Sequence, residues 1–161
     1  MDTRTIVFRL ALATVLGGIL GFEREVNGQN AGLRTHMIVA LGSCCFTLAS
    51  IFTEVRLGEG VLPEGTQTDI SRIASQVVVG IGFLGAGVIL RQGGTVTGLT
   101  TAANLWLTAS VGMTSGMGFY AAAGGTVGLA LLSLVALRPV ERAILRYRVK
   151  HGRTPMPPFD D

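Results

Sequence analysis

The side chains best equipped for chemistry in this sequence are polar groups that lie inside long apolar segments. Arg72, Gln76 and Asn104 each carry several hydrogen-bond donors, which are hard to satisfy by helix packing alone. Each of them costs free energy in hydrocarbon unless it finds a partner or faces a wet cavity. These three residues are therefore the first candidates for a site within a membrane.

Smaller polar side chains continue this pattern at spacings that place them on one face of a helix. The three stripes are His36, Ser43, Thr47 and Ser50; Arg72, Ser75, Gln76, Gly80, Phe83 and Gly87; and Thr101, Asn104, Thr108 and Ser115. We predict that the three stripes face one another. Ordinary serine and threonine hydrogen bonding between packed helices is the alternative interpretation.

All ten carboxylates lie outside the apolar segments. Because Mg²⁺ prefers oxygen ligands, commonly one or two carboxylates with retained waters, a cation pathway has no evident ligand in mid-membrane. Asp69 lies three residues before Arg72, where the two side chains can meet across one helical turn. We predict that they form a linked pair at the extracytoplasmic mouth, with a purely structural helix cap as the alternative role of Asp69.

Motifs for enzymatic or redox chemistry are missing from the sequence. There is no G-x-S-x-G elbow and no H-E-x-x-H pattern, and neither His36 nor His151 belongs to a metal or triad motif. The G-x-G-x-x-G run that starts at Gly80 lacks the preceding strand and the later acid of a dinucleotide site. Cys44 and Cys45 are neighbours on a helix and cannot form an ordinary disulfide. We predict a non-enzyme that uses no cofactor.

The elements that must position these residues are long apolar helices. The chain has 161 residues, of which 48% are hydrophobic and 14% charged, about half the charge content of a soluble domain. Five segments are each close to the roughly 17 to 25 residues that cross hydrocarbon as a helix. They are 6–22, 35–52, 73–90, 99–117 and 119–137. We predict an all-α integral membrane protein, a bundle of about five transmembrane helices, and exclude nucleic-acid binding.

Basic residues predict the orientation of these segments. With five crossings and a cytoplasmic C-terminus, nine of the thirteen basic residues lie in the cytoplasm, three lie outside, where the loop 53–71 is acidic, and Arg9 lies inside the first segment. This distribution follows the positive-inside rule. A re-entrant fourth segment, shortened by the glycine-rich stretch 114–118, would put the basic tail and the Arg24/Arg34 loop on opposite sides. We therefore favour five crossings.

The chain divides into a predicted transmembrane domain, 1–137, and a basic cytoplasmic helix with a disordered tail, 138–161. Arg138, Arg142 and Arg146 recur every four residues, which suits anionic lipid headgroups or a stop-transfer anchor. The first apolar segment lacks the features of a cleavable signal peptide, so we expect it to remain.

Small residues four positions apart let helix backbones approach closely in lipid. Such spacings occur at Gly17/Gly21, Gly112/Gly116 and Gly124/Gly128. Internal packing is the simpler interpretation of all three. Because the last segment lacks a polar stripe and can lie at the periphery, we predict a homodimer formed through its Gly124/Gly128 face.

Three blocks occur in order along the chain: REVNGQNAGLRTH at 24–36, DISRIASQVVVGIGFLGAG at 69–87 and GLTTAANLW at 98–106. With these blocks, residues 23 to about 120 closely resemble the MgtC/SapB family of bacterial inner-membrane proteins. The resemblance implies a protein linked to magnesium homeostasis, to survival under magnesium limitation or acid stress, and to virulence. It also implies, for some members, restraint of the membrane ATP synthase through protein contacts. A transporter or channel for an ion or small solute, using a polar intramembrane cavity, is the alternative.

The resemblance implies a functional polar site, because the family motifs fall on the polar stripes and on one cytoplasmic loop. Its inner end comprises Glu23, Arg24, Glu25, Arg34, Thr35 and His36; its outer end Asp69 and Arg72; and its lining Gln76, Thr100, Thr101 and Asn104. The sequence ends soon after Arg153, so no role of the C-terminal domain of longer members is transferred.

Overall fold

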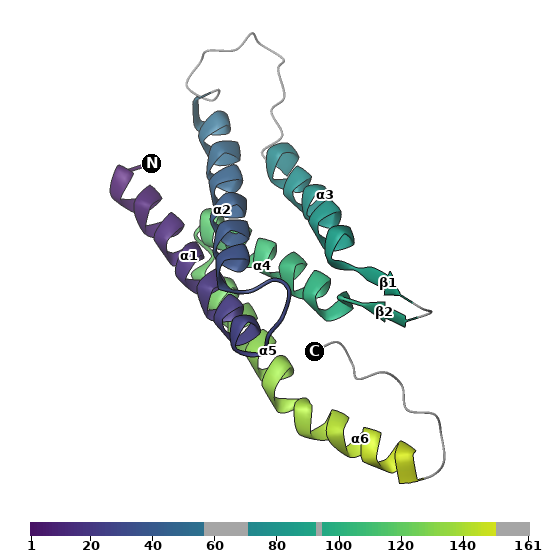
Figure 1. The fold of residues 1–161 in the computed structure, drawn as a ribbon. Coiled ribbons are helices and arrows are strands. Elements are labelled where there is room, and N and C mark those ends of the chain that lie inside the picture. The colour runs from purple at the N-terminus through teal and green to yellow at the C-terminus, as the bar shows by residue number, and fades with distance from the viewer. Residues whose placement is uncertain (57–70, 93–94, 151–161) are drawn as a thin grey trace.

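The computed structural model describes residues 1–56, 71–92 and 95–150 (Figure 1). Over these residues the chain forms six helices: α1 (Thr3–Val26), α2 (Leu33–Arg56), α3 (Ser71–Val88), α4 (Leu99–Met117), α5 (Tyr120–Ala136) and α6 (Arg138–Lys150). Three stretches are long and apolar enough to cross a membrane, namely Thr3–Val26, Leu33–Val55 and Tyr120–Ile144, and Ala74–Val88 is a shorter apolar helix. This agrees with an all-α membrane protein, and the number of five crossings stays a prediction.

A short hairpin that the sequence did not predict joins α3 to α4. Strand β1 (Leu90–Gln92) pairs antiparallel with β2 (Thr95–Thr97), so that Leu90 lies opposite Thr97. The third predicted segment therefore ends two residues early, at Val88. Gly98 follows β2 with φ +85°, and a Cβ at this position would collide with the Val88 carbonyl group. The hairpin thus returns the chain so that α4 runs back along α3 (Figure 1).

Helix α4 continues through its glycine-rich end instead of breaking there. It spans 19 residues and ends at Met117. The C-cap Gly118, with a φ of +82°, closes the last turn by donating its backbone N–H to the Ser115 carbonyl oxygen. Glycine suits this left-handed C-cap because it has no Cβ. The predicted stretch 114–118 therefore ends a regular helix.

Glycines allow α1, α2 and α4 to pack closely at the centre of the bundle. A Cβ on Gly17 would lie 2.6 Å from the Ala40 Cβ, and one on Gly116 would lie 2.9 Å from the Cys44 carbonyl oxygen. Gly112 approaches the Ala40 carbonyl group even more closely. Gly112 meets Ala40 and Gly116 meets Cys44, so the contacts advance in the same direction along both helices. Helices α2 and α4 therefore run parallel. Internal packing is thus confirmed for the first two small-residue spacings.

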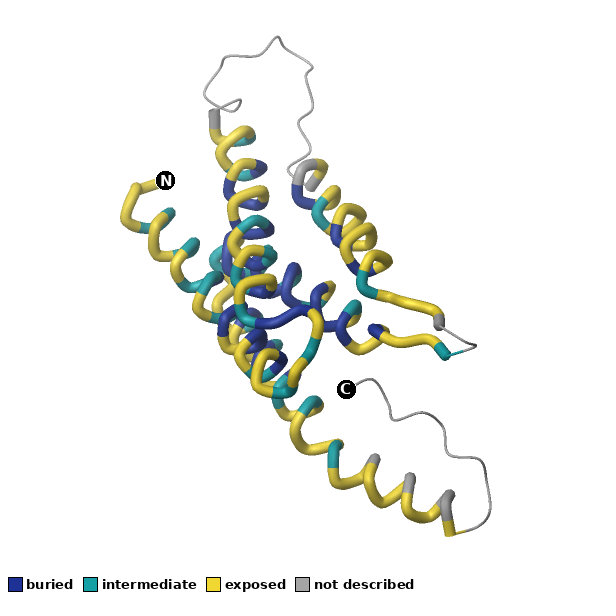
Figure 2. The backbone as a smooth tube through the Cα atoms, viewed as in Figure 1, coloured by how far each residue is buried: buried dark blue, intermediate teal, exposed yellow. Residues whose placement is uncertain are grey.

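Buried residues concentrate where these helices meet (Figure 2). One cluster joins α1, α4 and α5 through Leu20, Val111 and Val127, and another joins α3 to α4 through Ile81 and Leu105. Large apolar side chains elsewhere are exposed on the outer helix faces. Exposure of apolar side chains on the periphery is expected where the surrounding solvent is lipid.

Helix α6 begins at Arg138, where the sequence predicted the basic helix, and Pro139 lies in its first turn. A proline at this position is tolerated because the first backbone N–H groups of a helix have no partner within the helix. In Figure 1, α6 extends from the end of α5 away from the bundle. The predicted tail 151–161 lies outside the described residues.

Candidate functional site

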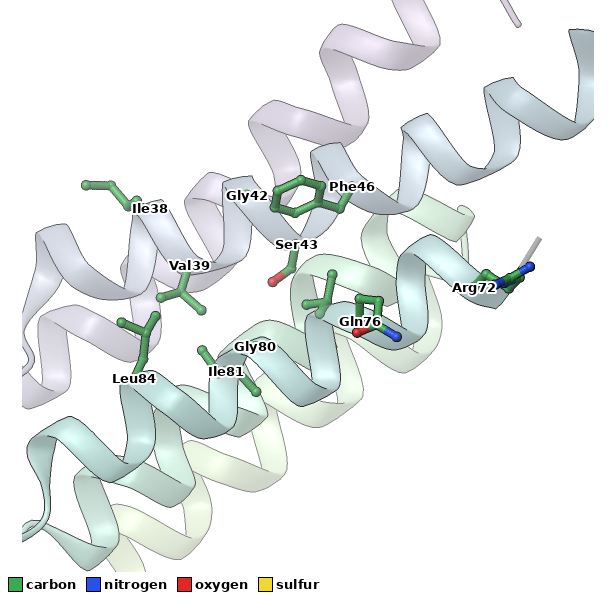
Figure 3. A pocket seen from close by; sticks show the side chains of 11 residues that line it. Ile38, Val39, Gly42, Ser43, Phe46, Arg72, Gln76, Gly80, Ile81 and Leu84 are labelled. Carbon is green, nitrogen blue, oxygen red and sulfur yellow. The ribbon is translucent and has the colours of Figure 1, made fainter. Parts of the chain in front are cut away.

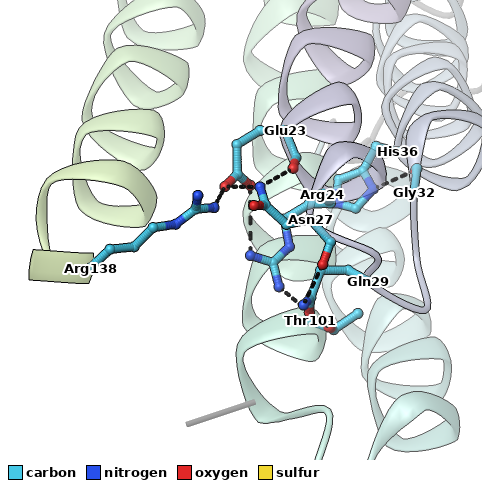
Figure 4. Close-up of polar contacts among 8 residues, drawn as sticks. All are labelled: Glu23, Arg24, Asn27, Gln29, Gly32, His36, Thr101 and Arg138. Carbon is cyan, nitrogen blue, oxygen red and sulfur yellow. Dashed lines mark hydrogen bonds and ion pairs between the residues drawn. The ribbon is translucent and has the colours of Figure 1, made fainter. Parts of the chain in front are cut away.

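Polar side chains from several elements converge at the end of the molecule where α1 ends and α2 and α4 begin (Figure 4). We call this group the inner polar cluster. Its members are Glu23, Arg24, Asn27, Gln29, His36, Thr101 and Arg138. The loop between α1 and α2 makes this convergence possible, since Gly28 adopts a φ of +70° directly after α1.

Arg24 is the buried centre of the inner polar cluster. Only 4% of its surface is exposed, although an arginine is almost never buried without partners. Its guanidinium donates to Gln29 Oε1, and its Nη1 lies 3.6 Å from a carboxylate oxygen of Glu23. Gln29 Oε1 also accepts a hydrogen bond from Thr101 Oγ1 at 3.3 Å. Through Gln29, the charge on α1 is tied to the first turn of α4.

Glu23 holds a second arginine as well. Its Oε1 accepts a hydrogen bond from Arg138 at the start of α6 and another, at 2.9 Å, from Asn27 Nδ2. The Glu23 side chain is 10% exposed, whereas that of Arg138 is 35% exposed. One carboxylate between two guanidinium groups leaves the cluster with a positive balance. The arrangement joins α1 to the end of the last apolar helix.

His36 and Asn104 are buried polar groups with unused hydrogen-bonding capacity. His36 Nδ1 lies 2.9 Å from the Gly32 carbonyl oxygen and donates to it, which leaves Nε2 as an acceptor in the neutral ring. Within the described part of the chain, neither His36 Nε2 nor Asn104 Nδ2 has a hydrogen-bond partner. Such groups in native proteins need an explanation, and a bound water or solute is the usual one.

The other residues predicted for the inner end lie around the cluster. Glu25 Oε2 accepts the Leu33 backbone N–H at 2.9 Å and so caps the first turn of α2. A Cβ on Gly32 would occupy the place of the Glu25 carboxylate, so glycine is required for this contact. Arg34 and Thr35 are exposed, and so is Thr100 on α4. The structure brings Glu23, Arg24, His36 and Thr101 together but leaves those three at the surface.

Two of the three predicted polar stripes lie buried against each other. His36, Ser43, Thr47 and Ser50 of α2 are buried, as are Thr101, Asn104, Thr108 and Ser115 of α4. The third stripe, on α3, is exposed, because α3 packs on α4 through its opposite face. On that face Ile81 contacts the cluster of Leu105 and Ala109, and Gly85 lies against Ala102. The α3 stripe does not join the buried interior as the other two do: its residues are exposed, and Arg72, Gln76 and Gly80 line an open groove against α2 that Ser43 also lines.

Arg72 and Gln76 therefore lie apart from Asn104. Arg72 and Gln76 are exposed, whereas Asn104 is buried. The α4 residues beside Asn104 contact α3 at Ile81 and Gly85, which lie more than one helical turn beyond Gln76. Asp69 lies outside the described residues, so its pairing with Arg72 stays a prediction.

Three partners of the buried charges were missed by sequence reasoning. Asn27 and Gln29 lie in the first family block but are not among the predicted site residues, and Arg138 belongs to a basic stripe that suits lipid headgroups or a stop-transfer anchor. A fourth missed contact involves Arg9, whose Nη1 donates to the Gly116 carbonyl oxygen at 2.7 Å. An arginine suits this place because carbonyl groups at a helix C-terminus carry partial negative charge. The only available signal was that an arginine inside an apolar segment requires a partner.

The cluster offers no evident site for a cation. Across residues 1–56, 71–92 and 95–150, no group of three or more histidine, cysteine, aspartate and glutamate side chains is placed to hold a metal ion. Glu23 is occupied by arginines, and Glu25 caps a helix. The chemistry of the cluster favours structural linkage or binding of a neutral or anionic group.

Comparisons with known proteins place these observations in context. A sequence model of the MgtC family matches residues 10–143. The chain is 42% identical over 118 residues to the "Putative magnesium transporter YhiD" of Escherichia coli, covering 73% of this chain and 54% of that protein. It is 37% identical over 143 residues to "Protein MgtC" of Brucella abortus, covering 89% and 56%.

An uncharacterized protein of Haemophilus influenzae is 39% identical over 154 residues, which cover 92% of this chain and 64% of that protein. The chain thus spans little more than half the length of the curated relatives that head the comparison. No solved structure matches.

Proposed function

Because this chain belongs to the MgtC family, we propose that it is a multi-pass protein of the bacterial inner membrane that regulates a membrane partner. We propose that it regulates this partner under magnesium limitation or acid stress, including the magnesium limitation or acid stress met during virulence. The regulated partner that the family resemblance implies is the membrane ATP synthase. No chemical step and no cofactor are part of this proposal.

The observation that carries the proposal is the state of Glu23. It is the carboxylate of the inner polar cluster, and it is bound by Arg24 and Arg138. Its Oε1 accepts hydrogen bonds from Arg138 and Asn27, while its Oε2 lies 3.6 Å from the Arg24 guanidinium and has no hydrogen-bond partner among the described residues. A cation at this carboxylate would therefore meet two positive charges at close range. The central helix pair also packs backbone against backbone at Gly112 and Gly116, which closes the interior where its polar stripes meet. A protein that acts through its outer surface fits these contacts better than one that conducts Mg²⁺.

The orientation in this proposal follows from charge. The α1–α2 loop, the β1–β2 hairpin and the start of α6 lie toward one end of the bundle (Figure 1). That end carries Arg24, Arg34, Arg91 and Arg138, so the positive-inside rule makes it cytoplasmic. The C-terminus would then lie in the cytoplasm, and α1 to α5 would cross the membrane in alternating directions.

Reconstitution separates regulation from transport. Purified ATP synthase is placed in liposomes with or without this protein, and ATP-driven proton pumping is measured beside entry of Mg²⁺ into the same liposomes. A regulator lowers pumping and leaves Mg²⁺ entry at the level of liposomes without it. Unchanged pumping together with protein-dependent Mg²⁺ entry would refute the proposal.

Transport is the second candidate function, and two observations favour it. One relative carries the name of a putative magnesium transporter. Within the described residues, His36 Nε2 and Asn104 Nδ2 are buried and have no hydrogen-bond partner, as expected of groups that receive water or a solute. A transporter of an ion or small solute would show saturable uptake that Asn104→Ala abolishes and the exposed change Thr100→Ala leaves intact.

We also propose that the protein forms a homodimer through α5. A Cβ on Gly124 or Gly128 would meet no described atom within 4 Å, so this face is open to another helix. Replacing both glycines with leucine should weaken association in detergent without changing the helical content. Sedimentation at several protein concentrations measures the dimer, and an unchanged dimer fraction would reject this face.

A further inference from the structure

A groove between α2 and α3 extends from Ile38 and Leu84 at one end to Arg72 at the other (Figure 3). Its volume is about 600 Å³, within the range of small-molecule sites in proteins. Apolar side chains line most of its length, including Phe46 on α2 and Leu84 on α3. Gly42 and Gly80 widen it, since a Cβ on either would meet no described atom within 4 Å.

The charged and amide side chains of the groove lie at one end, and Ser43 is the polar residue along the apolar part. Arg72 and Gln76 form this polar end, in the first two turns of α3, and Figure 3 shows them beyond the row of apolar side chains. Both are exposed, and among the described residues no carboxylate or carbonyl group accepts a hydrogen bond from the Arg72 guanidinium. An arginine at the beginning of an apolar helix lies at the depth of the lipid headgroups when that helix enters a membrane.

We propose that this groove binds one anionic phospholipid. An acyl chain lies between α2 and α3, and the phosphate accepts hydrogen bonds from Gln76 and from those of the five Arg72 donors that the predicted pair with Asp69 leaves free. A guanidinium group matches the geometry of a phosphate and can bind it through two parallel hydrogen bonds. Under the charge-based orientation, the lipid belongs to the extracytoplasmic leaflet.

The shape of the groove favours a lipid over a helix from another protein. Helices α2 and α3 contact each other along the groove, and a helix with side chains is about 10–12 Å across. Such a helix could cover the opening but could not enter it. An acyl chain is thin and flexible, and the charged and amide contacts at a single end match an amphiphile with one charged group. The proposal does not depend on whether the protein regulates or transports.

Native mass spectrometry of the purified full chain tests the charge at the polar end. The protein in detergent is titrated with phosphatidylglycerol and, separately, with zwitterionic phosphatidylcholine. For Arg72→Gln we expect about fivefold weaker retention of phosphatidylglycerol and little change for phosphatidylcholine, since one basic residue contributes about 1 kcal/mol near an anionic lipid. Arg91→Gln, which removes an exposed arginine from β1, is the matched control and should retain both lipids. Equal phosphatidylglycerol retention by wild type and Arg72→Gln would overturn the proposal.

A second pair of variants tests the apolar part of the groove. Gly80→Leu fills it, whereas Gly82→Leu adds the same side chain to an exposed position of α3 that does not line the groove. Only Gly80→Leu should lose the retained lipid, with helical content unchanged by circular dichroism. A photo-crosslinking residue at Phe46 should yield a lipid adduct. A protein adduct at that position, from a second copy or another membrane protein, would overturn the proposal.

Discussion

The two regions richest in polar side chains use them in opposite ways. In the inner polar cluster, Arg24 is almost completely buried and is held by Glu23 and Gln29. Along α3, Arg72 and Gln76 are exposed at the end of an apolar groove. The residue types are similar, but only the first set is surrounded by helices. The difference shows that an arginine links helices when its side of the helix packs against other helices, and is exposed when it does not.

The largest effect should come from removing the carboxylate in the inner polar cluster. Glu23→Gln leaves Arg24 buried without its counter-charge, and loss of one partner of a buried ion pair destabilises a protein by roughly 3–5 kcal/mol. Glu25→Gln is the control, because Glu25 is exposed and its amide still accepts the Leu33 N–H. Unfolding by increasing detergent denaturant, followed by circular dichroism, measures both. Equal unfolding midpoints would show that the cluster does not hold the helices.

The next effect compares a glycine of the buried α2–α4 interface with a glycine of the exposed α3 groove. Gly112→Leu forces α2 away from α4, because a Cβ at Gly112 already collides with the Ala40 carbonyl group. Overpacking of this kind costs about 1–3 kcal/mol. Gly80→Leu adds the same atoms to the open groove on α3 and should change the unfolding midpoint little. A larger loss of stability for Gly80→Leu would contradict the packing described for α3.

A smaller loss is expected at Arg9, which is buried only in part. Arg9→Gln removes the charged hydrogen bond to the Gly116 carbonyl group and the contact with the Tyr120 hydroxyl group, at 3.3 Å. Hydrogen bonds to charged groups contribute about 1.5–3 kcal/mol, and partial exposure places this one at the lower end. Arg4→Gln, at an exposed position of α1, should not shift the thermal midpoint. Identical midpoints for the two variants would refute the role of Arg9 as the partner of the α4 C-terminus.

The smallest effect on stability should follow Arg72→Gln. Changes at exposed positions without a defined structural role usually stay within about 0.5 kcal/mol. The same unfolding assay, run beside Arg138→Gln, tests this expectation, since Arg138 is bound to Glu23 and should lose more. If Arg72→Gln lowers the stability as much as Arg138→Gln, then Arg72 also stabilises the fold and the contrast between the two regions is wrong.

Much of the fold could be predicted from hydrophobicity and small-residue spacing. The five apolar segments correspond to α1–α5, because apolar length is a local property of the chain. The orientation of α3 could not be predicted, since both of its faces satisfy a helical pattern and the packed face is marked only by small or apolar residues such as Ala74 and Gly85. The residue pattern identifies which side chains share a helix face, but which helix packs against that face depends on the arrangement of the whole bundle.

Only part of the candidate site could be predicted, because some partners come from distant parts of the chain. Glu23, Arg24, His36 and Thr101 belong to recognisable sequence blocks, and the structure gathers them. The Arg138 partner of Glu23 lies 115 residues away, and no local signal connects the two. The role of Gln29 depends on the path of a turn, which residue types alone do not specify.

The contact between Arg9 and Gly116 bears on how the protein is made. The two residues are 107 positions apart, so a ribosome adding about 5–20 residues per second needs roughly 5–20 s to deliver the acceptor after the donor. During that interval the first helix carries an arginine about 9 Å from its N-terminal end without its final partner. The insertion machinery or the membrane surface must hold this helix until α4 emerges. This contact of the bundle therefore forms late in synthesis, and a truncation before residue 116 would leave Arg9 without the Gly116 acceptor.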